Sequence, residues 1–295
     1  MNILTQTKHK FFSPARIFAI SSNTVLELVR LKVFYFLLLF GLLIIGSSAF
    51  VVKFSFQEQF QVLKDVSLGA MSIFTTLLGI LSTAFLLPKD IEDRTLYTIL
   101  AKPVPRFEYL LGKLCGVLVL LLIATVLMGG LFAAVLYYRE SIEIAATMRG
   151  AAPDQLADQL AAIKAATFNA NLIPGIVLIY LKAAVCAAFT LLLSTFASST
   201  IFTIMVSFVV YFIGNVQSLA RDYWLEDRTI GAGIRLFVAG VALVFPDLQL
   251  FNLVDDIAAG AAVPLAVFVK TALLGGVYTA VYFLAGYFLF ASKEL

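Results

Sequence analysis

Long apolar runs separated by shorter polar segments dominate this chain. An α-helix rises about 1.5 Å per residue, so about 20 apolar residues cross a hydrocarbon core of about 30 Å. Strand-like alternation is absent, and backbone groups cannot go unpaired in lipid, so these runs are expected to be helices. The pattern predicts an all-α membrane protein with six transmembrane helices, at 33–52, 67–87, 114–138, 172–193, 201–219 and 264–291.

Composition supports this interpretation and adds few further constraints. Hydrophobic residues make up 61% of the 295 positions, well above the roughly 45–50% of soluble proteins. We expect the whole chain, 1–295, to be a single transmembrane domain surrounded by membrane lipid. The net charge of +3 is small, so no nucleic-acid partner is expected. Cys115 and Cys186 lie in or beside predicted spans, so no structural disulfide is expected.

Basic residues near the ends of the spans predict the orientation, because Lys and Arg collect on the cytoplasmic side of a membrane. With six spans, the segments 1–32 and 88–113, the loop after the fourth span and the C-terminal tail share one side, which carries 11 basic residues. The opposite loops carry 8 over a greater length. Both termini and the segment 88–113 are therefore expected in the cytoplasm, with 139–171 and 220–263 as outer loops.

The segment 13–32 is predicted to form a helix along the cytoplasmic surface. Ser13 can cap such a helix, and Pro14 suits its first position. Apolar and polar residues separate onto different faces, as in an interfacial anchor. The residues expected on the apolar face are Ile17, Phe18, Val25, Leu28 and Val29, and those expected elsewhere are Asn23, Glu27 and Arg30.

The two outer loops contain further predicted elements. In 139–171, residues 153–168 are predicted to form one short amphipathic helix. In 220–263, the apolar stretch 231–245 is too short for an ordinary crossing and is predicted to be a re-entrant segment before the sixth span. A full crossing is the alternative if Arg235 reaches the membrane surface with its long side chain.

The segment 88–113 is the most informative part of the chain. It is densely charged and broken by prolines between two long uncharged runs. Residues 91–100 have helical spacing, and Pro103 and Pro105 end that helix because proline lacks the amide and disfavours helix in the residue before it. A second helix is expected from near Phe107 into the third span. The result is a short helix across the mouth of a two-helix hairpin, which can transmit a push from a soluble partner.

This segment resembles the cytoplasmic signature of the type-2 ABC-exporter permease family, in the branch that includes permeases of copper-enzyme maturation. A generic cytoplasmic loop would explain its Lys and Arg residues but not its acidic residues or its double-proline break. The matching positions in the segment are Glu92, Arg94-Thr95, Leu100, Lys102-Pro103-Val104-Pro105-Arg106, Tyr109 and Leu111-Gly112-Lys113. Matches elsewhere are Asn23-Thr24, Glu27, Arg30, Leu193-Ser194-Thr195-Phe196, Phe245-Pro246-Asp247-Leu248 and Phe251-Asn252.

In that family the signature forms a coupling helix that docks on an ATPase subunit. The resemblance implies that this chain is the permease subunit of an ATP-driven ABC transporter, an exporter in the bacterial plasma (inner) membrane. Its expected partners are an ABC-type ATPase subunit and a second permease, either another copy or a related chain. The residues assigned to ATPase coupling are Glu92, Asp93, Arg94, Thr95, Tyr97, Lys102, Pro103, Arg106 and Lys113.

The chain itself is not expected to be an enzyme. The spacing GxxxxGK[ST] is absent, so ATP is expected on the partner subunit, and this chain is expected to bind no cofactor or metal. The alternative is an ion-coupled secondary transporter, which would show internal symmetry with matching broken helices. No convincing repeat is visible. An intramembrane enzyme is disfavoured because no predicted span contains a histidine or paired acidic residues.

Two lysines lie within predicted spans, Lys182 near the middle of the fourth and Lys270 inside the sixth. A charge at mid-bilayer costs at least roughly 2.5–3.5 kcal/mol on insertion scales, so each should face protein or a watery cavity. One hypothesis places Lys182, together with Asn215, in the transport pathway, where it lines the route or binds an anionic group. The other hypothesis has Lys182 packing against backbone carbonyls or hydroxyl groups. The transported substrate is left open.

Overall fold

The computed structural model describes residues 13–50, 56–92, 104–150, 155–168, 171–197, 199–226, 233, 245–252, 257 and 263–292. Within these ranges the chain is helical and contains no strand, as the apolar runs predict. In chain order, the elements are α1 (Pro14–Val29), α2 (Lys32–Ser47), η1 (Ser48–Phe50), α3 (Phe56–Glu92), α5 (Arg106–Gly150), α6 (Leu156–Thr167), α7 (Leu172–Phe196), α8 (Thr200–Glu226), η2 (Leu248–Phe251) and α11 (Leu265–Ser292).

Six helices of the described part are long and apolar enough to cross a membrane, which confirms the predicted number. They are α2 with η1, α3, α5, α7, the first part of α8 and α11. Each overlaps one of the predicted apolar runs. Hydropathy therefore located all six spans.

Several helices extend well beyond the apolar runs that predicted them. α3 continues through Pro88 to Glu92, and α5 continues to Gly150. Apolar composition marks only the part of a helix that lipid requires, whereas backbone hydrogen bonding continues into polar sequence. Much of the predicted outer loop 139–171 is therefore helical, formed by the last turns of α5 and by α6. With 45 residues, α5 is about 68 Å long and projects beyond a core of about 30 Å.

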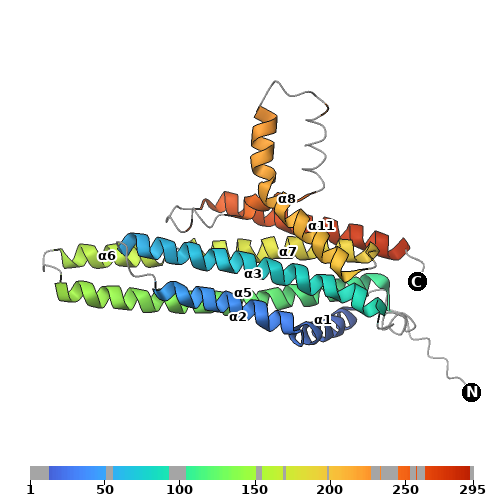
Figure 1. The fold of residues 1–295 in the computed structure, drawn as a ribbon, viewed down its shortest axis with the longest axis horizontal. Coiled ribbons are helices and arrows are strands. Elements are labelled where there is room, and N and C mark those ends of the chain that lie inside the picture. Colours follow the sequence, from blue (N-terminus) through green and yellow to red (C-terminus); the bar gives the residue numbers. More distant parts are fainter. Residues whose placement is uncertain are drawn as a thin grey trace, which may run out of the picture.

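The helices α3 and α7 form the centre of the bundle (Figure 1). In the most apolar 18-residue stretch of each of these two helices, 72% is buried by the rest of the chain. The corresponding share is 28% in α2, α8 and α11. α7 packs mainly against α3 and α11, and α3 packs also against α5 and α2. The peripheral helices expose many large apolar side chains, a surface suited to lipid or to another membrane chain.

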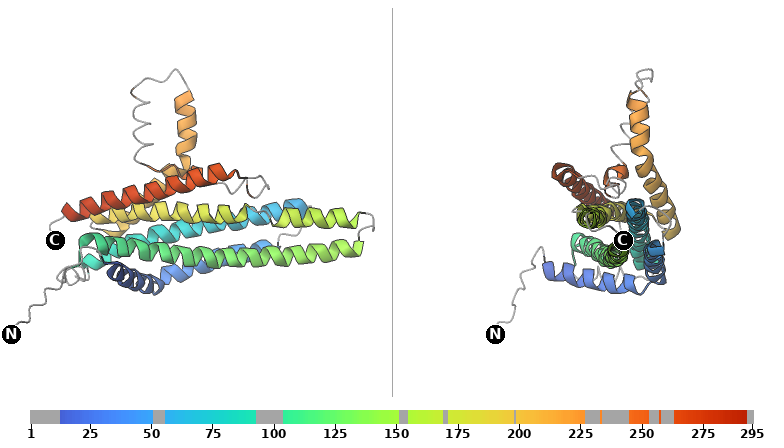
Figure 2. Two further views of the ribbon diagram at one scale, coloured as in Figure 1. Left: turned by 180° about the vertical axis from the view of Figure 1, so that it is seen from behind. Right: turned by 90° about the vertical axis from the view of Figure 1, so that its left-hand side faces the viewer.

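The helix α1 lies across the bundle axis and against α5, near one end of the bundle (Figure 2). Two glycines of α5 allow the close approach. A Cβ on Gly112 would lie 2.7 Å from the Cβ of Ile20, and a Cβ on Gly116 would lie 2.6 Å from the Cβ of Thr24. Small residues spaced by four let two helix backbones meet in this way. We call this end of the bundle the α1 end, and the opposite end the α6 end.

The start of α1 agrees with the sequence in position but not in its capping contact. Pro14 lies in the first turn, and Ser13 occupies the N-cap position. The Ser13 hydroxyl makes no capping hydrogen bond. Instead, the backbone N–H of Ser13 donates to a carboxylate oxygen of Glu108 at 2.8 Å. A side chain of α5 therefore stabilises the start of α1, and no local pattern could predict this contact.

The faces predicted for α1 meet different surroundings in the structure. Phe18, expected on the apolar face of an interfacial helix, is 76% exposed. Glu27, expected to face elsewhere, points into the bundle, where it pairs with lysines of α3 and α5. Leu28, also expected on the apolar face, is buried. The ion pairs of Glu27 were not predicted, because the charges that attract it belong to distant parts of the chain.

Polar contacts join α3, α5 and α6 at the α6 end. Lys64 was expected in an outer loop, but it belongs to α3 and is 2% exposed. Its ammonium donates to the backbone carbonyl of Ala166, in the last turn of α6, at 2.5 Å. A cation at a helix C-terminus complements the unpaired carbonyls there. Arg139 of α5 donates to the side-chain oxygen of Gln59 of α3 at 2.8 Å.

The first part of α8 lies along the outside of the bundle, and its C-terminal part turns away from it (Figures 1 and 2). The stretch 231–245 lies almost wholly outside the described residues, so its re-entrant course stays a prediction. The described residues that follow pack within the bundle. The ring centroid of Phe245 lies 6.4 Å from that of Phe189 in α7. A Cβ on Gly214 of α8 would lie 2.7 Å from the carbonyl oxygen of Pro246.

Candidate functional site

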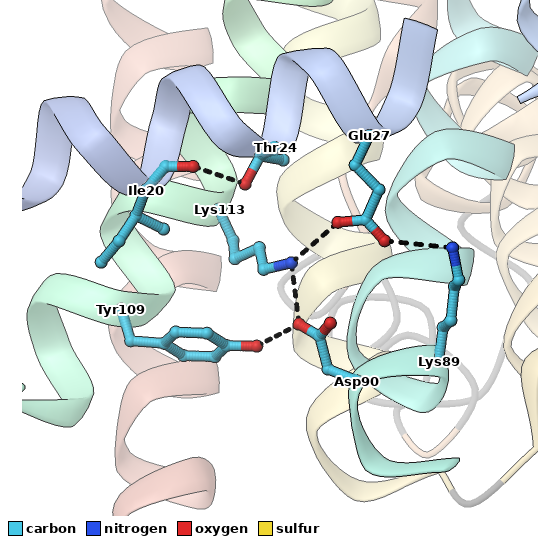
Figure 3. Close-up of polar contacts among 7 residues, drawn as sticks. All are labelled: Ile20, Thr24, Glu27, Lys89, Asp90, Tyr109 and Lys113. Carbon is cyan, nitrogen blue, oxygen red and sulfur yellow. Dashed lines mark hydrogen bonds and ion pairs between the residues drawn. The ribbon is translucent and has the colours of Figure 1, made fainter. Parts of the chain in front are cut away.

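Charged side chains from three helices gather at the α1 end (Figure 3). Asp90 and Lys113 are 6% and 3% exposed, and such burial is costly unless the charges are paired. We call this group the charge cluster. Its members are Glu27 of α1, Lys89 and Asp90 of α3, and Tyr109 and Lys113 of α5.

The ammonium of Lys113 lies at the centre of the charge cluster. It is 2.7 Å from Oδ2 of Asp90 and 3.3 Å from Oε2 of Glu27. The other oxygen of Glu27 accepts from Lys89 at 3.3 Å. The Tyr109 hydroxyl donates to Asp90. Two cations and two carboxylates thus balance each other, and the contacts run without a break from α1 to α3 and α5.

Helix geometry brings these side chains together. Tyr109 and Lys113 are four residues apart on α5 and share a face, with the lysine nitrogen 5.8 Å from the centroid of the tyrosine ring. On α3, Lys89 and Asp90 are helical only because the helix continues past Pro88. Proline removes one backbone hydrogen bond there. That continuation directs Asp90 at Lys113.

A further ion pair, partly buried, joins the start of α1 to the start of α5. The Arg16 guanidinium donates to both carboxylate oxygens of Glu108, at 2.5 and 2.9 Å. The Glu108 side chain is 1% exposed, and it lies in the first turn of α5, where the helix dipole favours a negative charge. The hydrogen bond to Glu108 raises the pKa of Arg16 above its ordinary value. The ion pair is bidentate, with two hydrogen bonds that fix the orientation of both side chains.

Arg106 connects α5 to the end of α11. Its guanidinium donates to the carbonyl of Phe290 at 3.3 Å and to that of Ala291 at 2.7 Å. These carbonyls belong to the last turn of α11, where a cation complements the helix dipole. Polar side-chain contacts therefore link α1, α3, α5 and α11 at the α1 end.

The structure describes only some of the residues assigned to coupling. Arg106 and Lys113 both bind groups of their own chain. Glu92 is the last residue of α3, and its side chain is not among the described ones. The remaining six lie outside the described residues, so the helix at 91–100 and its docking role stay predictions. They are Asp93, Arg94, Thr95, Tyr97, Lys102 and Pro103.

Sequence reasoning missed the partners that these residues find within the chain. Asp90 was not singled out, because its role depends on α3 continuing past Pro88, where the sequence indicates a break. The pair of Arg16 and Glu108 had a weak signal, since each lies at the start of a predicted helix. Nothing in the sequence shows that the two helix starts meet.

The structure brings together the two residues assigned to the transport pathway. Lys182 of α7 is 3% exposed, and its ammonium donates to Oδ1 of Asn215 of α8 at 2.8 Å. The ammonium also lies 5.6 Å from the ring centroid of Tyr211. The amide of Asn215 donates to the carbonyl of Tyr211 at 2.8 Å. The partner of Lys182 is thus an amide side chain.

Two further observations bear on what the chain can do. The described residues contain no group of three or more side chains arranged to hold a metal ion. A family model described as ABC-2 family transporter protein matches residues 18–295. That match covers every candidate membrane span, the charge cluster and the pair of Lys182 and Asn215. No curated protein matches the chain significantly.

Proposed function

The chain belongs to the ABC-2 transporter family and is the membrane-spanning permease of an ABC transporter, and we propose that it is an exporter driven by a separate ATPase bound at the α1 end. The sequence lacks the GxxxxGK[ST] phosphate loop, so ATP would bind to that partner. The excess of basic residues on the side of 88–113 supports a cytoplasmic α1 end, in a bacterial plasma membrane.

The charge cluster is the observation that carries this proposal. Residues 93–105 connect the end of α3 to the start of α5, so an ATPase bound to them acts on both helices. Lys113 joins those helices to each other through Asp90 and to α1 through Glu27. Removing one partner of a buried ion pair typically costs about 3–5 kcal/mol. The three helix ends therefore resist separation and move together.

A displacement at the α1 end would reach the middle of the bundle. α3 is one of the two central helices, and it packs along α7. Because packed helices shift as rigid elements, tilting the end of α3 changes its contact with α7. Arg106 extends the same connection to α11. ATP-driven closure of the partner would in this way alter the route through the membrane.

A second permease, either a copy of this chain or a related one, is proposed to pack on α8. One face of α8 carries an apolar stripe, each member of which is 51–65% exposed. The stripe follows the alternating three- and four-residue spacing of two helices that pack along each other. Its members are Phe202, Met205, Val209, Phe212 and Val216. Asn215 approaches Lys182 from α8, so we place this pair beside the transport route.

Charge reversal in the segment 88–113 tests the docking of the ATPase. The double substitution Glu92→Lys with Asp93→Lys removes two acidic groups of the proposed docking helix and leaves the charge cluster intact. We expect the ATPase to be lost from the purified complex, because like charges then oppose the contact. Copurification and ATP hydrolysis measure the outcome. Arg106 is left unchanged, since its reversal would also disturb the end of α11.

The control applies the same chemistry at the far end of α5. Glu140→Lys with Glu143→Lys introduces the same charge change close to the α6 end. This variant should keep its ATPase. If the variant at positions 92 and 93 binds and stimulates the ATPase as well as the control does, the proposed docking site is wrong.

A further inference from the structure

Lys182 is a cation held in the middle of the membrane-spanning region. It lies ten residues after Leu172 and 14 before Phe196 in α7, which places it about 15 and 21 Å from the two helix ends. It is 3% exposed. The four ion pairs described in the chain all lie at the α1 end, and none includes Lys182.

The described surroundings of Lys182 attract a cation without neutralising it. Its ammonium has three N–H donors, and one donates to the neutral amide oxygen of Asn215 at 2.8 Å. The face of the Tyr211 ring lies 5.6 Å away, and an aromatic face favours a nearby cation. A methionine of similar length would fill the space at lower cost if packing were the only requirement.

The buried carboxylate of Asp247 does not supply the missing negative charge. Asp247 is 3% exposed and precedes η2, which packs against both α7 and α8. One of its oxygens accepts from the backbone N–H of Gln249 at 3.1 Å, so the carboxylate caps η2. Asp247 and Lys182 form no ion pair in the described structure. The charge of Lys182 is left to meet an anion from outside this set of residues.

We propose that Lys182 and Asn215 form the binding site for an oxyanion group, a carboxylate or a phosphate, of the transported molecule. The inference rests on the proposed function, because it places substrate in the route of the permease. The oxyanion accepts a hydrogen bond from the ammonium of Lys182, and a charged acceptor makes a stronger bond than the neutral oxygen of Asn215 does. Because the same ammonium contacts Asn215 of α8, the helix with the exposed stripe, the arrival of substrate acts on the contact between α7 and α8, where a second permease packs.

The test measures ATP hydrolysis by the permease and its ATPase reconstituted together in phosphatidylcholine vesicles. Two probes separate the two sources of an oxyanion. Benzoate is added to the buffer as a soluble carboxylate, and phosphatidylglycerol is mixed into the vesicles as a lipid phosphate. We expect one of them to stimulate hydrolysis by the unaltered complex. The half-maximal amount should rise about tenfold or more in Lys182→Met, since a hydrogen bond to a charged group contributes at least that factor.

Two variants control this experiment. Lys182→Arg keeps the positive charge and should keep most of the response, which separates charge from folding. Lys270→Met removes the single lysine of α11, which is exposed, and should respond as the unaltered complex does. Melting temperatures of all variants show whether each is folded.

Each outcome decides the proposal. Stimulation by benzoate that Lys182→Met weakens identifies a soluble anion, and the same result with phosphatidylglycerol identifies a lipid. Equal stimulation of the unaltered complex and Lys182→Met, or no stimulation by either probe, overturns the anion site. If no ATPase copurifies with the unaltered chain, the proposed function fails instead. Protection of the permease alone against heating by benzoate or dodecyl phosphate, compared between the unaltered chain and Lys182→Met, then decides the anion site by itself.

Discussion

Lys64, Lys113 and Lys182 are each at most 3% exposed, yet they meet different partners. Lys113 lies between two carboxylates, Lys64 binds a carbonyl at a helix end, and Lys182 binds a neutral amide. The cost of burying the ammonium is therefore offset by ion pairs at Lys113, by a helix dipole at Lys64 and only by neutral groups at Lys182. Neighbours from other helices, and not the lysines themselves, set these roles.

Substituting Lys113 tests the charge cluster at this scale. Lys113→Met leaves the carboxylates of Asp90 and Glu27 without their shared cation, so the free energy of unfolding should fall by about 3–5 kcal/mol. Unfolding of the purified protein in detergent, followed by heat or denaturant, measures the change. Lys164→Met, which removes an exposed lysine of α6, should have little effect.

A companion variant identifies the cause of the loss. Adding Asp90→Asn to Lys113→Met removes one of the two buried carboxylate charges that Lys113 balanced, and it should restore part of the stability. If Lys113→Met is as stable as the unaltered chain, the ion pairs of the charge cluster contribute nothing measurable and the coupling argument loses its support.

At the scale of helices, the features that follow from local sequence can be separated from those that do not. The existence and approximate centre of each transmembrane helix followed from runs of apolar residues, and the helix at 153–168 reappears as α6. The ends did not follow, because α3 continues through Pro88 and α5 continues to Gly150. Where a helix ends depends on contacts that stabilise its last turns, such as the one between Asp90 and Lys113.

The crossing of α1 and α5 provides a test at the scale of elements. A side chain at position 116 would overlap Thr24 and the backbone of Ser21. Gly116→Leu should therefore push α1 away and destabilise the protein by about 1–3 kcal/mol. Faster tryptic cleavage at the exposed Arg30 and a lower melting temperature would report the change.

A second glycine of the same helix serves as the control. A Cβ on Gly130 of α5 would have open space around it, with no atom of a packed neighbour within 4 Å among the described residues. Gly130→Leu should therefore behave as the unaltered protein does. Indistinguishable proteolysis of the two variants would show that α1 does not pack closely on Gly116.

For the whole molecule, the arrangement places α3 and α7 at the centre and leaves α8 at the periphery (Figure 1). The apolar stripe of α8 is exposed. Two copies related by a twofold axis would bring identical residues of the stripe close to each other. Because Asn215 belongs to α8, only α8 itself would then separate the pair of Lys182 and Asn215 from that interface.

Cross-linking tests this arrangement. Val209→Cys introduces a cysteine in the middle of the stripe, and under oxidising conditions we expect a disulfide-linked dimer of the chain in membranes. Leu273→Cys places a cysteine on α11, where the side chain is 67% exposed, and should cross-link little. The unaltered chain, with Cys115 and Cys186, gives the background. Equal cross-linking at both positions, or none at Val209→Cys, would contradict a homodimer along α8.

The sequence by itself determined the membrane class of this protein, the number and place of its six spans and the helix at its N-terminus. Hydropathy is a property of each residue and its near neighbours, so these features need no knowledge of the fold. The resemblance carried by 88–113 also identified the family correctly. The helix at 91–100 and the stretch 231–245 lie largely outside the described residues and stay predictions.

Only the tertiary structure decided which charges meet. Glu27, Asp90 and Lys113 are far apart in the sequence, and so are Lys182 and Asn215. Their pairing depends on how each helix is rotated, how far it extends and which helix lies beside it. Those quantities are set by packing across the bundle, such as the approach of α1 to Gly112 and Gly116, and a linear pattern does not contain them.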